Sequence, residues 1–182
     1  AKELLLSEVK WAERTRLLET GDLSPDVMDK NNKDMRKVVG GMLIQDRDLL
    51  LSKLDEAEVA TKKSPTPKQM NDLKFAWICC KHVKSNAITL VKNGMIVGTG
   101  AGQMSRVDAT EAALRKAKDR ADGAVMASDA FFPSPDAVEI AAEAGVTAIV
   151  QPGGAKGDQK VAEAANKQGI SMLMTGNRHF LH

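Results

Sequence analysis

Aromatic residues are scarce in this sequence: they make up 3% of 182 residues, with four Phe, two Trp and no Tyr. A base-stacking surface for nucleic acid needs more aromatic side chains than this. The formal net charge of +2 is also too small to indicate nucleic acid or an anionic membrane as a partner. No apolar run approaches the roughly 18 residues of a membrane span. We therefore expect binding to neither nucleic acid nor membrane.

Cysteine is equally rare, because Cys79 and Cys80 are the only two and they are adjacent. Neighbouring cysteines rarely bridge each other, and a pair makes neither a disulfide framework nor a zinc site. We expect two packed thiols in a reducing cytoplasm. The sequence opens at Ala1 without an initiator Met or a cleavable signal pattern. We expect a processed chain or a piece of a longer one.

The composition changes near residue 66, which divides the sequence into two parts. Residues 1–66 are charged and helix-like at first, and Val38–Asp48 is typical of a short buried strand that ends in a polar turn. Thr66 and Pro67 form a helix start, since Thr caps well and Pro suits the first helical position. We predict a mostly helical connecting segment over 1–66 and an α/β domain over 67–182.

The second part alternates between helical and strand patterns. The dipeptide Asn93-Gly94 is a strong hairpin signal between the β-like residues 86–92 and 95–100. Helices are predicted over 68–82, 105–121, 135–144 and 158–168, and apolar strands over 124–127, 146–150 and 170–174. A hairpin followed by alternating helices and strands predicts a layered sheet whose later strands are parallel, reached by right-handed crossovers.

A glycine-rich stretch, Gly98–Arg106, joins the hairpin to the next helix. Ser105 is placed to cap that helix, and helix-start amides favour an anion. Arg106 falls in the first turn, where it can add a charge-assisted contact to a phosphate or carboxylate. The stretch is neither a P-loop nor a dinucleotide fingerprint. A plain tight turn and an anion site both remain open.

Two later loops also follow strands and precede helices. In the first, Phe131 and Phe132 lie between Asp129 and Pro133, and they either pack under the loop or stack on a flat ligand. Asp136, at its end, is either a helix cap or a ligand contact. The second loop, residues 151–158, is glycine-rich and is either a connector or part of the same site. Ligands collect beyond the carboxyl ends of strands in such sheets, so we expect one shared site.

Two other motifs carry titratable groups. The end of the sequence, residues 176–182, contains Arg178, two His and a Phe, so we expect it to be tied to the domain. Lys81 and His82 look like a reactive pair, but they fall at the end of a predicted helix, where the dipole favours cations. We assign that pair a structural role.

Five motifs recur in family order between Val38 and His182. They are Lys84-Ser85-Asn86-Ala87, Gly100–Arg106, Ser128–Pro133, Gln151–Gly154 and Arg178-His179-Phe180. In these motifs the sequence resembles the transferase region of the bifunctional purine-biosynthesis family that combines aminoimidazole carboxamide ribonucleotide (AICAR) formyltransferase with inosinate (IMP) cyclohydrolase. The resemblance implies a cytidine-deaminase-like three-layer α/β/α sandwich with a mixed sheet, in an enzyme that moves a formyl group from 10-formyltetrahydrofolate to AICAR.

The resemblance also implies roles for single residues. AICAR would be contacted by Asn86, Arg106 and Arg178. The folate side would be lined by Val107, Phe131, Asp136 and the Ala155-Lys156 backbone. Asp129 would help to bind a structural potassium ion, and the site would lie at a dimer interface.

The sequence departs from the family in ways that bear on activity. The family's catalytic Lys-His motif and the cyclohydrolase domain are absent, and Lys81-His82 belongs to a different motif. Ser134-Pro135 and Ala155 also differ from many relatives. The zinc signature of deaminases is not present in the sequence, so we expect no zinc. We therefore predict the carboxy-terminal half of a transformylase, or a shortened homologue, inactive alone and completed by a homodimer or a partner chain. The alternative is a non-catalytic nucleotide- or folate-binding or dimerisation subunit.

Overall fold

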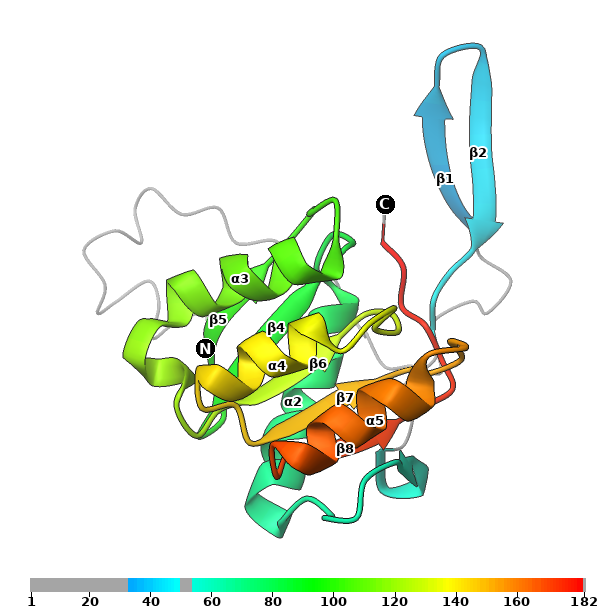
Figure 1. Ribbon diagram of the computed structural model, residues 1–182. Coiled ribbons are helices and arrows are strands. Elements are labelled where there is room, and N and C mark those ends of the chain that lie inside the picture. Colours follow the sequence, from blue (N-terminus) through cyan, green and yellow to red (C-terminus); the bar gives the residue numbers. More distant parts are fainter. Residues whose placement is uncertain (1–32, 50–53, 182) are drawn as a thin grey trace, which may run out of the picture. The chain divides into compact units, whose positions relative to one another are not determined.

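A computed structural model describes residues 33–49 and 54–181 (Figure 1). The chain divides after Leu49 into one unit of residues 1–49 and another of residues 50–182. The predicted division after Thr66 stays a prediction. Among the described residues, none of the helices is long and apolar enough to cross a membrane.

The described part of the first unit is a β-hairpin of β1 (Lys33–Val38) and β2 (Gly41–Asp46). Our expectation of one buried strand over Val38–Asp48 is wrong. Gly40, with φ of +83°, instead allows a tight turn between two strands, and nearly all their side chains are exposed. The prediction of a mostly helical segment is also wrong for the residues of this hairpin. Residues 1–32 of the predicted segment lie outside those described.

The second unit contains a six-stranded mixed sheet in the order β3-β8-β7-β6-β4-β5. Its strands are β3 (Glu58–Val59), β4 (Ile88–Lys92), β5 (Met95–Gly100), β6 (Val125–Ser128), β7 (Ala148–Gln151) and β8 (Ser171–Met174). Strands β6, β7 and β8 are mutually parallel, whereas β4 is antiparallel to both β5 and β6. Asn93 and Gly94, with φ of 54° and 70°, turn β4 into β5, which confirms the predicted hairpin.

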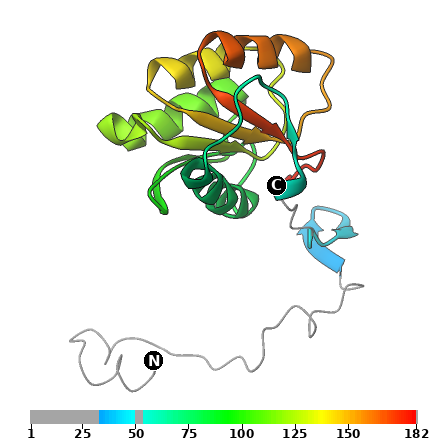
Figure 2. The same ribbon diagram turned by 90° about the horizontal axis from the view of Figure 1, so that it is seen from below.

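Helices begin where the sequence predicts them. They are α2 (Pro67–Lys81), α3 (Arg106–Ala117), α4 (Asp136–Glu143) and α5 (Asp158–Lys167), with 3₁₀ turns at Leu54–Glu56 and Lys118–Ala121. Thr66 and Gln69 form a capping box at α2, and Ser105 accepts from the Asp108 amide at the start of α3. Figure 2 shows α2 on one side of the sheet and α3, α4 and α5 on the other.

Strand side chains alternate between two cores, one for each face of the sheet. Leu90, Met126 and Ile149 pack beneath α3, α4 and α5, whereas Val125 and Val150 pack with Trp77 of α2. These strands are buried on both faces, as expected for strands covered by helices. The fold is therefore α/β, with a mixed sheet between helices.

Two glycines of β5 set the distance between this strand and α3. A Cβ on Gly100 would lie 1.9 Å from the Ala109 carbonyl oxygen, and one on Gly98 would lie 2.2 Å from that of Ala113. The two glycines therefore lie in a strand packed against a helix rather than in a ligand loop. Of the predicted turn, residues 101–105 remain as the connection, with Gly102 at φ of +62°.

Strand directions bring several loops to one edge of the sheet. Because β4 is antiparallel to both of its neighbours, β5 runs in the same direction as β6, β7 and β8. The segments that follow these four strands, and the one that precedes β4, therefore meet at one edge. That edge is where the sequence predicts a shared site.

Candidate functional site

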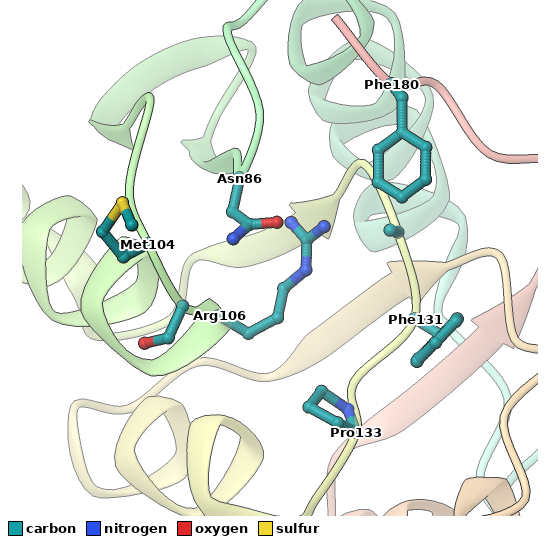
Figure 3. Close-up of a pocket in the computed structure, with 8 residues that line it drawn as sticks. Asn86, Met104, Arg106, Phe131, Pro133 and Phe180 are labelled. Carbon is teal, nitrogen blue, oxygen red and sulfur yellow. The ribbon is translucent and has the colours of Figure 1, made fainter. Parts of the chain in front are cut away.

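A pocket of about 320 Å³ opens at this edge of the sheet (Figure 3). Its lining comes from the segment before β4, the β5–α3 connection, the loop after β6 and the end of the chain. The residues are Asn86, Met104, Ser105, Arg106, Ala130, Phe131, Pro133 and Phe180. The structure thus brings together Asn86, Arg106 and Phe131 from three separate predicted motifs. Figure 3 shows the Arg106 guanidinium beside the Asn86 side chain, between Met104 and the two Phe rings.

Arg106 forms a buried ion pair with Asp129 beside the pocket. Its side chain is 6% exposed, and that of Asp129 is fully buried. Nη1 of Arg106 donates to Oδ1 of Asp129 and, at 3.3 Å, to the Ala87 carbonyl. The same carboxylate oxygen accepts from the Ala87 amide at 3.0 Å. The guanidinium is therefore held in one orientation with its charge largely neutralised.

Asp129 was predicted as a potassium ligand, and its surroundings test that role. One carboxylate oxygen accepts from Arg106 and Ala87, and the other accepts from the Ser85 hydroxyl. A cation at this carboxylate would face the Arg106 guanidinium, so the side chain as placed does not fit a cation ligand.

Asn86 is held by backbone pairing with the β5–α3 connection. Its amide donates to the Gln103 carbonyl at 3.2 Å, and its side-chain Nδ2 donates to the same oxygen at 3.0 Å. The Gly102 amide in turn donates to Lys84 at 2.7 Å. The two bonds to Gln103 use N–H donors of Asn86. Its side-chain oxygen points toward the pocket in Figure 3.

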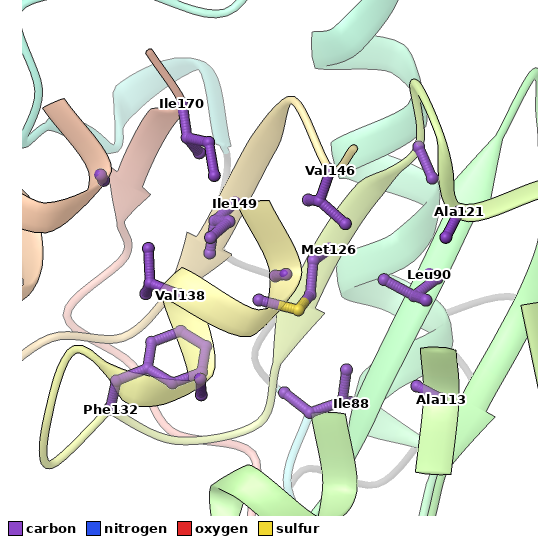
Figure 4. Packing of buried hydrophobic residues seen from close by; sticks show 14 of the residues in the cluster. Ile88, Leu90, Ala113, Ala121, Met126, Phe132, Val138, Val146, Ile149 and Ile170 are labelled. Carbon is purple, nitrogen blue, oxygen red and sulfur yellow. The ribbon is translucent and has the colours of Figure 1, made fainter. Parts of the chain in front are cut away.

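The two adjacent phenylalanines have different environments, although the sequence offers the same two alternatives for both. Phe132 is fully buried in the core under α4 (Figure 4), and its amide donates to the Gln151 side chain at 3.2 Å. Phe131 is half-buried and lines the pocket. The Arg178 guanidinium lies over the Phe131 ring, with Cζ 5.8 Å from its centroid. Arg178 is therefore next to the pocket, although it does not line it.

The other predicted folate contacts are not among the pocket's lining residues. Asp136 is the first residue of α4 and accepts from the Ser134 hydroxyl at 2.8 Å, while Pro135 occupies the cap position. Val107, the second residue of α3, packs against the core.

The glycine-rich loop after β7 is organised by Asp158, which accepts from the amides of Gly154 and Ala155 at 2.6 and 3.1 Å. Ala155 and Lys156 therefore belong to a connector with its own internal hydrogen bonds. A Cβ on Gly157 would lie 3.1 Å from the Pro133 carbonyl oxygen, so this loop abuts the one that carries Phe131.

Lys81 and His82 lie at the end of α2, as predicted. The His82 amide donates to the Cys79 carbonyl at 3.1 Å as the helix ends. The neighbouring Cys80 thiol is buried and points to the Ala87 and Ala127 carbonyls at 3.6 and 3.5 Å. Burial, reinforced by the nearby Asp129 charge, raises the pKa of Cys80 to about 12. Cys80 is thus a packed neutral thiol rather than a nucleophile.

Sequence reasoning did not assign Met104, Ala130 or Phe180 to the pocket, and it gave Ser85 no role. The unusual composition of residues 176–182 was the available signal for Phe180. Met104 is 94% exposed at the pocket. A methionine in the sequence does not by itself indicate that it lines a pocket.

Comparison with known proteins places the chain in a family. Residues 1–116 match the family model described as AICARFT/IMPCHase bienzyme. The bifunctional purine biosynthesis protein PurH of Thermoanaerobacter sp. (strain X514) is 53% identical over 149 residues, which are 82% of this chain and 29% of that protein. PurH of Rhodopirellula baltica is 42% identical over 179 residues, which are 98% of this chain and 34% of that protein. The chain belongs to the AICARFT/IMPCHase bienzyme family, and it spans about a third of the length of these relatives.

Among solved structures, the dCMP deaminase of cyanophage S-TIM5 is similar over 59% of this chain and 97% of that protein. The TM-score is 0.41 and the sequence identity is 19%.

Proposed function

We propose that this chain supplies part of an AICAR formyltransferase site in purine biosynthesis. The observation that carries the proposal is the single pocket-side cluster of Asn86, Arg106 and Phe131, three residues that the family resemblance assigns to AICAR and folate. The proposal includes a cytidine-deaminase-like three-layer sandwich, 10-formyltetrahydrofolate as the co-substrate and a cytoplasmic location.

The electrostatics of the pocket favour a flat ring with neutral polar groups. Arg106 is already paired with Asp129, so it acts as an oriented hydrogen-bond donor rather than as an unpaired cation. The Asn86 amide adds a polar group that recognises a carboxamide well. Phe131 offers a ring face for stacking. An imidazole carboxamide, as in AICAR, has this combination.

The phosphate of AICAR requires a cation that is not neutralised by a buried carboxylate. Arg178 is exposed and lies over Phe131, next to the pocket. Arginine matches phosphate through paired N–H groups. We therefore assign the ring of AICAR to Asn86 and Arg106, and its phosphate to Arg178.

A conjugated amine is a weak nucleophile, so formyl transfer to it depends on holding the two reactants in line. This chain provides such positioning groups. The proton transfers would need a general acid–base group. The family's Lys-His motif would provide it, and this sequence does not contain that motif. We propose that a second copy or a partner chain carrying the first half of the transferase region completes the site.

Calorimetric titration with AICAR tests the proposed pocket. The variant Arg106→Lys keeps the charge but loses the planar fork, so we expect at least about a tenfold weaker affinity. Arg115→Lys makes the same exchange at an exposed position of the same helix and should bind as the parent chain does. Equal affinities for the two variants, or no AICAR binding by the parent chain, would remove the proposed role.

A non-catalytic binding subunit is the second candidate, because the sequence contains no family Lys-His motif and Lys81-His82 ends helix α2. It predicts AICAR binding without turnover even when a protein carrying the first half is added. A purely dimerising subunit predicts no binding of AICAR or of a folate analogue.

A further inference from the structure

The segment that follows β8, residues 175–181, crosses the ends of three other strands. The Thr175 amide donates to the Gln151 carbonyl at the end of β7 at 3.0 Å. The His179 amide donates to the Asp129 carbonyl just beyond β6 at 3.0 Å. We call residues 175–181 the closing segment. It brings Arg178 to Phe131 and places Phe180 in the pocket wall (Figure 3).

Ser85 joins the closing segment to the start of β4. Its amide donates to the Leu181 carbonyl at 2.8 Å, and its hydroxyl oxygen accepts from the Leu181 amide at 3.0 Å. The side chain is nearly buried and does not line the pocket. Ser85 therefore contacts the segment that carries Phe180 and Arg178 without facing a ligand itself.

The same hydroxyl reaches the ion pair of the pocket. It donates its proton to Oδ2 of Asp129, while Oδ1 accepts from Arg106. A serine hydroxyl has one proton, so donation to Asp129 leaves its oxygen lone pairs to accept from Leu181. The bonds therefore converge on the Asp129 carboxylate: Leu181 donates to Ser85 and Ser85 to Oδ2, while Arg106 donates to Oδ1. Accepting from Leu181 polarises the Ser85 hydroxyl and so strengthens its own donation to Asp129 in this buried setting.

We propose that Ser85 is a positioning residue that couples docking of the closing segment to the orientation of Arg106. When the segment is docked, the Ser85 hydroxyl is fixed, and with it the carboxylate that aims the guanidinium. A ligand that needs Arg106 in this orientation therefore stabilises the docked segment, and the docked segment raises affinity for that ligand by the same factor. The ligand part of this inference rests on the proposed function.

Nuclear magnetic resonance of the variant Ser85→Ala tests the coupling without any ligand. We expect the Leu181 amide to exchange with solvent at least about tenfold faster, because it loses its hydroxyl acceptor. We also expect the Arg106 Nε–H signal, identified by its loss in Arg106→Lys, to shift toward that of a free side chain. A merely structural role for Ser85 would move the first readout and not the second. Ser85→Thr keeps the hydroxyl and should restore both.

The matched control is Ser171→Ala. Ser171 is also buried, at the other end of β8, and among the residues the structure describes its hydroxyl has no hydrogen-bond partner. This variant should leave both signals as in the parent chain. If Ser85→Ala folds, as judged by circular dichroism, and leaves either signal unchanged, the coupling is wrong. If it does not fold, Ser85→Thr and a chain ending at Phe180 provide the same comparison, and an unmoved Arg106 signal in the shortened chain overturns the proposal.

AICAR titration adds the functional readout. We expect Ser85→Ala to bind AICAR about tenfold more weakly, and AICAR to slow Leu181 exchange in the parent chain but not in this variant. Failure of the parent chain to bind AICAR would count against the proposed function, while the Leu181 and Arg106 signals would still decide the coupling.

Discussion

Phe131 and Phe132 show how far residue types in sequence can specify a site. The sequence predicts an aromatic wall beside a strand end, and both alternatives that it offers are found, one for each ring. Phe131 lines the pocket and Phe132 is fully buried in the core. Which ring takes which place follows from the exit of β6 and from Gln151, which accepts from the Phe132 amide. That partner is 19 residues away, so local sequence does not reveal it.

Arg106 and Asp129 show the limit of residue-level prediction more clearly. The family resemblance assigns them separately, Arg106 to the nucleotide and Asp129 to a cation, because matching motifs treats them as independent groups. The structure pairs them in a buried contact, which changes the charge that either presents to a ligand. The pairing depends on how β4, β6 and α3 meet, and no spacing in the sequence encodes it.

At the residue scale, the two adjacent thiols should differ in reactivity. Cys79 is partly exposed, whereas burial raises the pKa of Cys80 to about 12 and leaves it protonated at pH 8. Partial burial also raises the pKa of the Cys79 thiol, but its exposure should let a thiol reagent at pH 8 modify Cys79 well before Cys80, which should react only as fast as the domain opens. Peptide mapping identifies the modified residue. In the urea control the reagent should modify both thiols at the same rate. Rapid labelling of Cys80 in the folded chain would contradict the assigned burial.

At the scale of elements, the hairpin and the alternating helices and strands of residues 67–174 were predictable because capping and turn residues mark their ends. Thr66, Ser105 and Asn93-Gly94 act locally, and the structure uses each as predicted. The glycines of β5 were interpreted less well. A glycine needed for close helix packing looks the same in sequence as one needed for a ligand, and only the 1.9 Å approach at Gly100 distinguishes them.

The close approach of α3 to β5 leads to a stability prediction. Gly100→Ala would place a methyl group against the Ala109 carbonyl, which is backbone and cannot rotate away. We expect the free energy of unfolding to fall by about 1–3 kcal/mol or more, as for other overpacked sites. Urea denaturation measures it. Gly41→Ala adds the same methyl where no atom lies within 4 Å, and it should change stability little. Equal midpoints for the two variants would refute the packing role.

At the scale of the whole molecule, the sequence predicts the structure of the second unit better than that of the first. Residues 33–46 form a hairpin with both faces largely exposed, and the apolar run Met42–Ile44 looks like a core strand because hydrophobicity alone does not say whether a face is covered. An isolated two-stranded hairpin is marginally stable in water. The second unit has two cores and was predictable from its periodicity.

The chain as a whole should not transfer formyl groups when it is assayed alone. Lys81-His82 ends helix α2, and neither residue lines the pocket. With AICAR and 10-formyltetrahydrofolate, release of tetrahydrofolate followed by absorbance should stay at the uncatalysed rate. PurH of Thermoanaerobacter sp. is the matched positive control. Robust turnover by this chain would show that the pocket contains its own acid–base groups.

The bonds of Ser85 to Leu181 span 96 residues of sequence, and that of Thr61 to Met172 spans 111. Contacts of such separation form only after long stretches of chain have been closed into loops, which is slow. The helices, with their local caps, can form first. A refolding chain should therefore regain most of its helical circular dichroism before the pocket exists. During that interval Phe131, Phe180 and the unpaired Arg106 are exposed to contact with other chains. The last bonds to form therefore also end the period in which the molecule can aggregate.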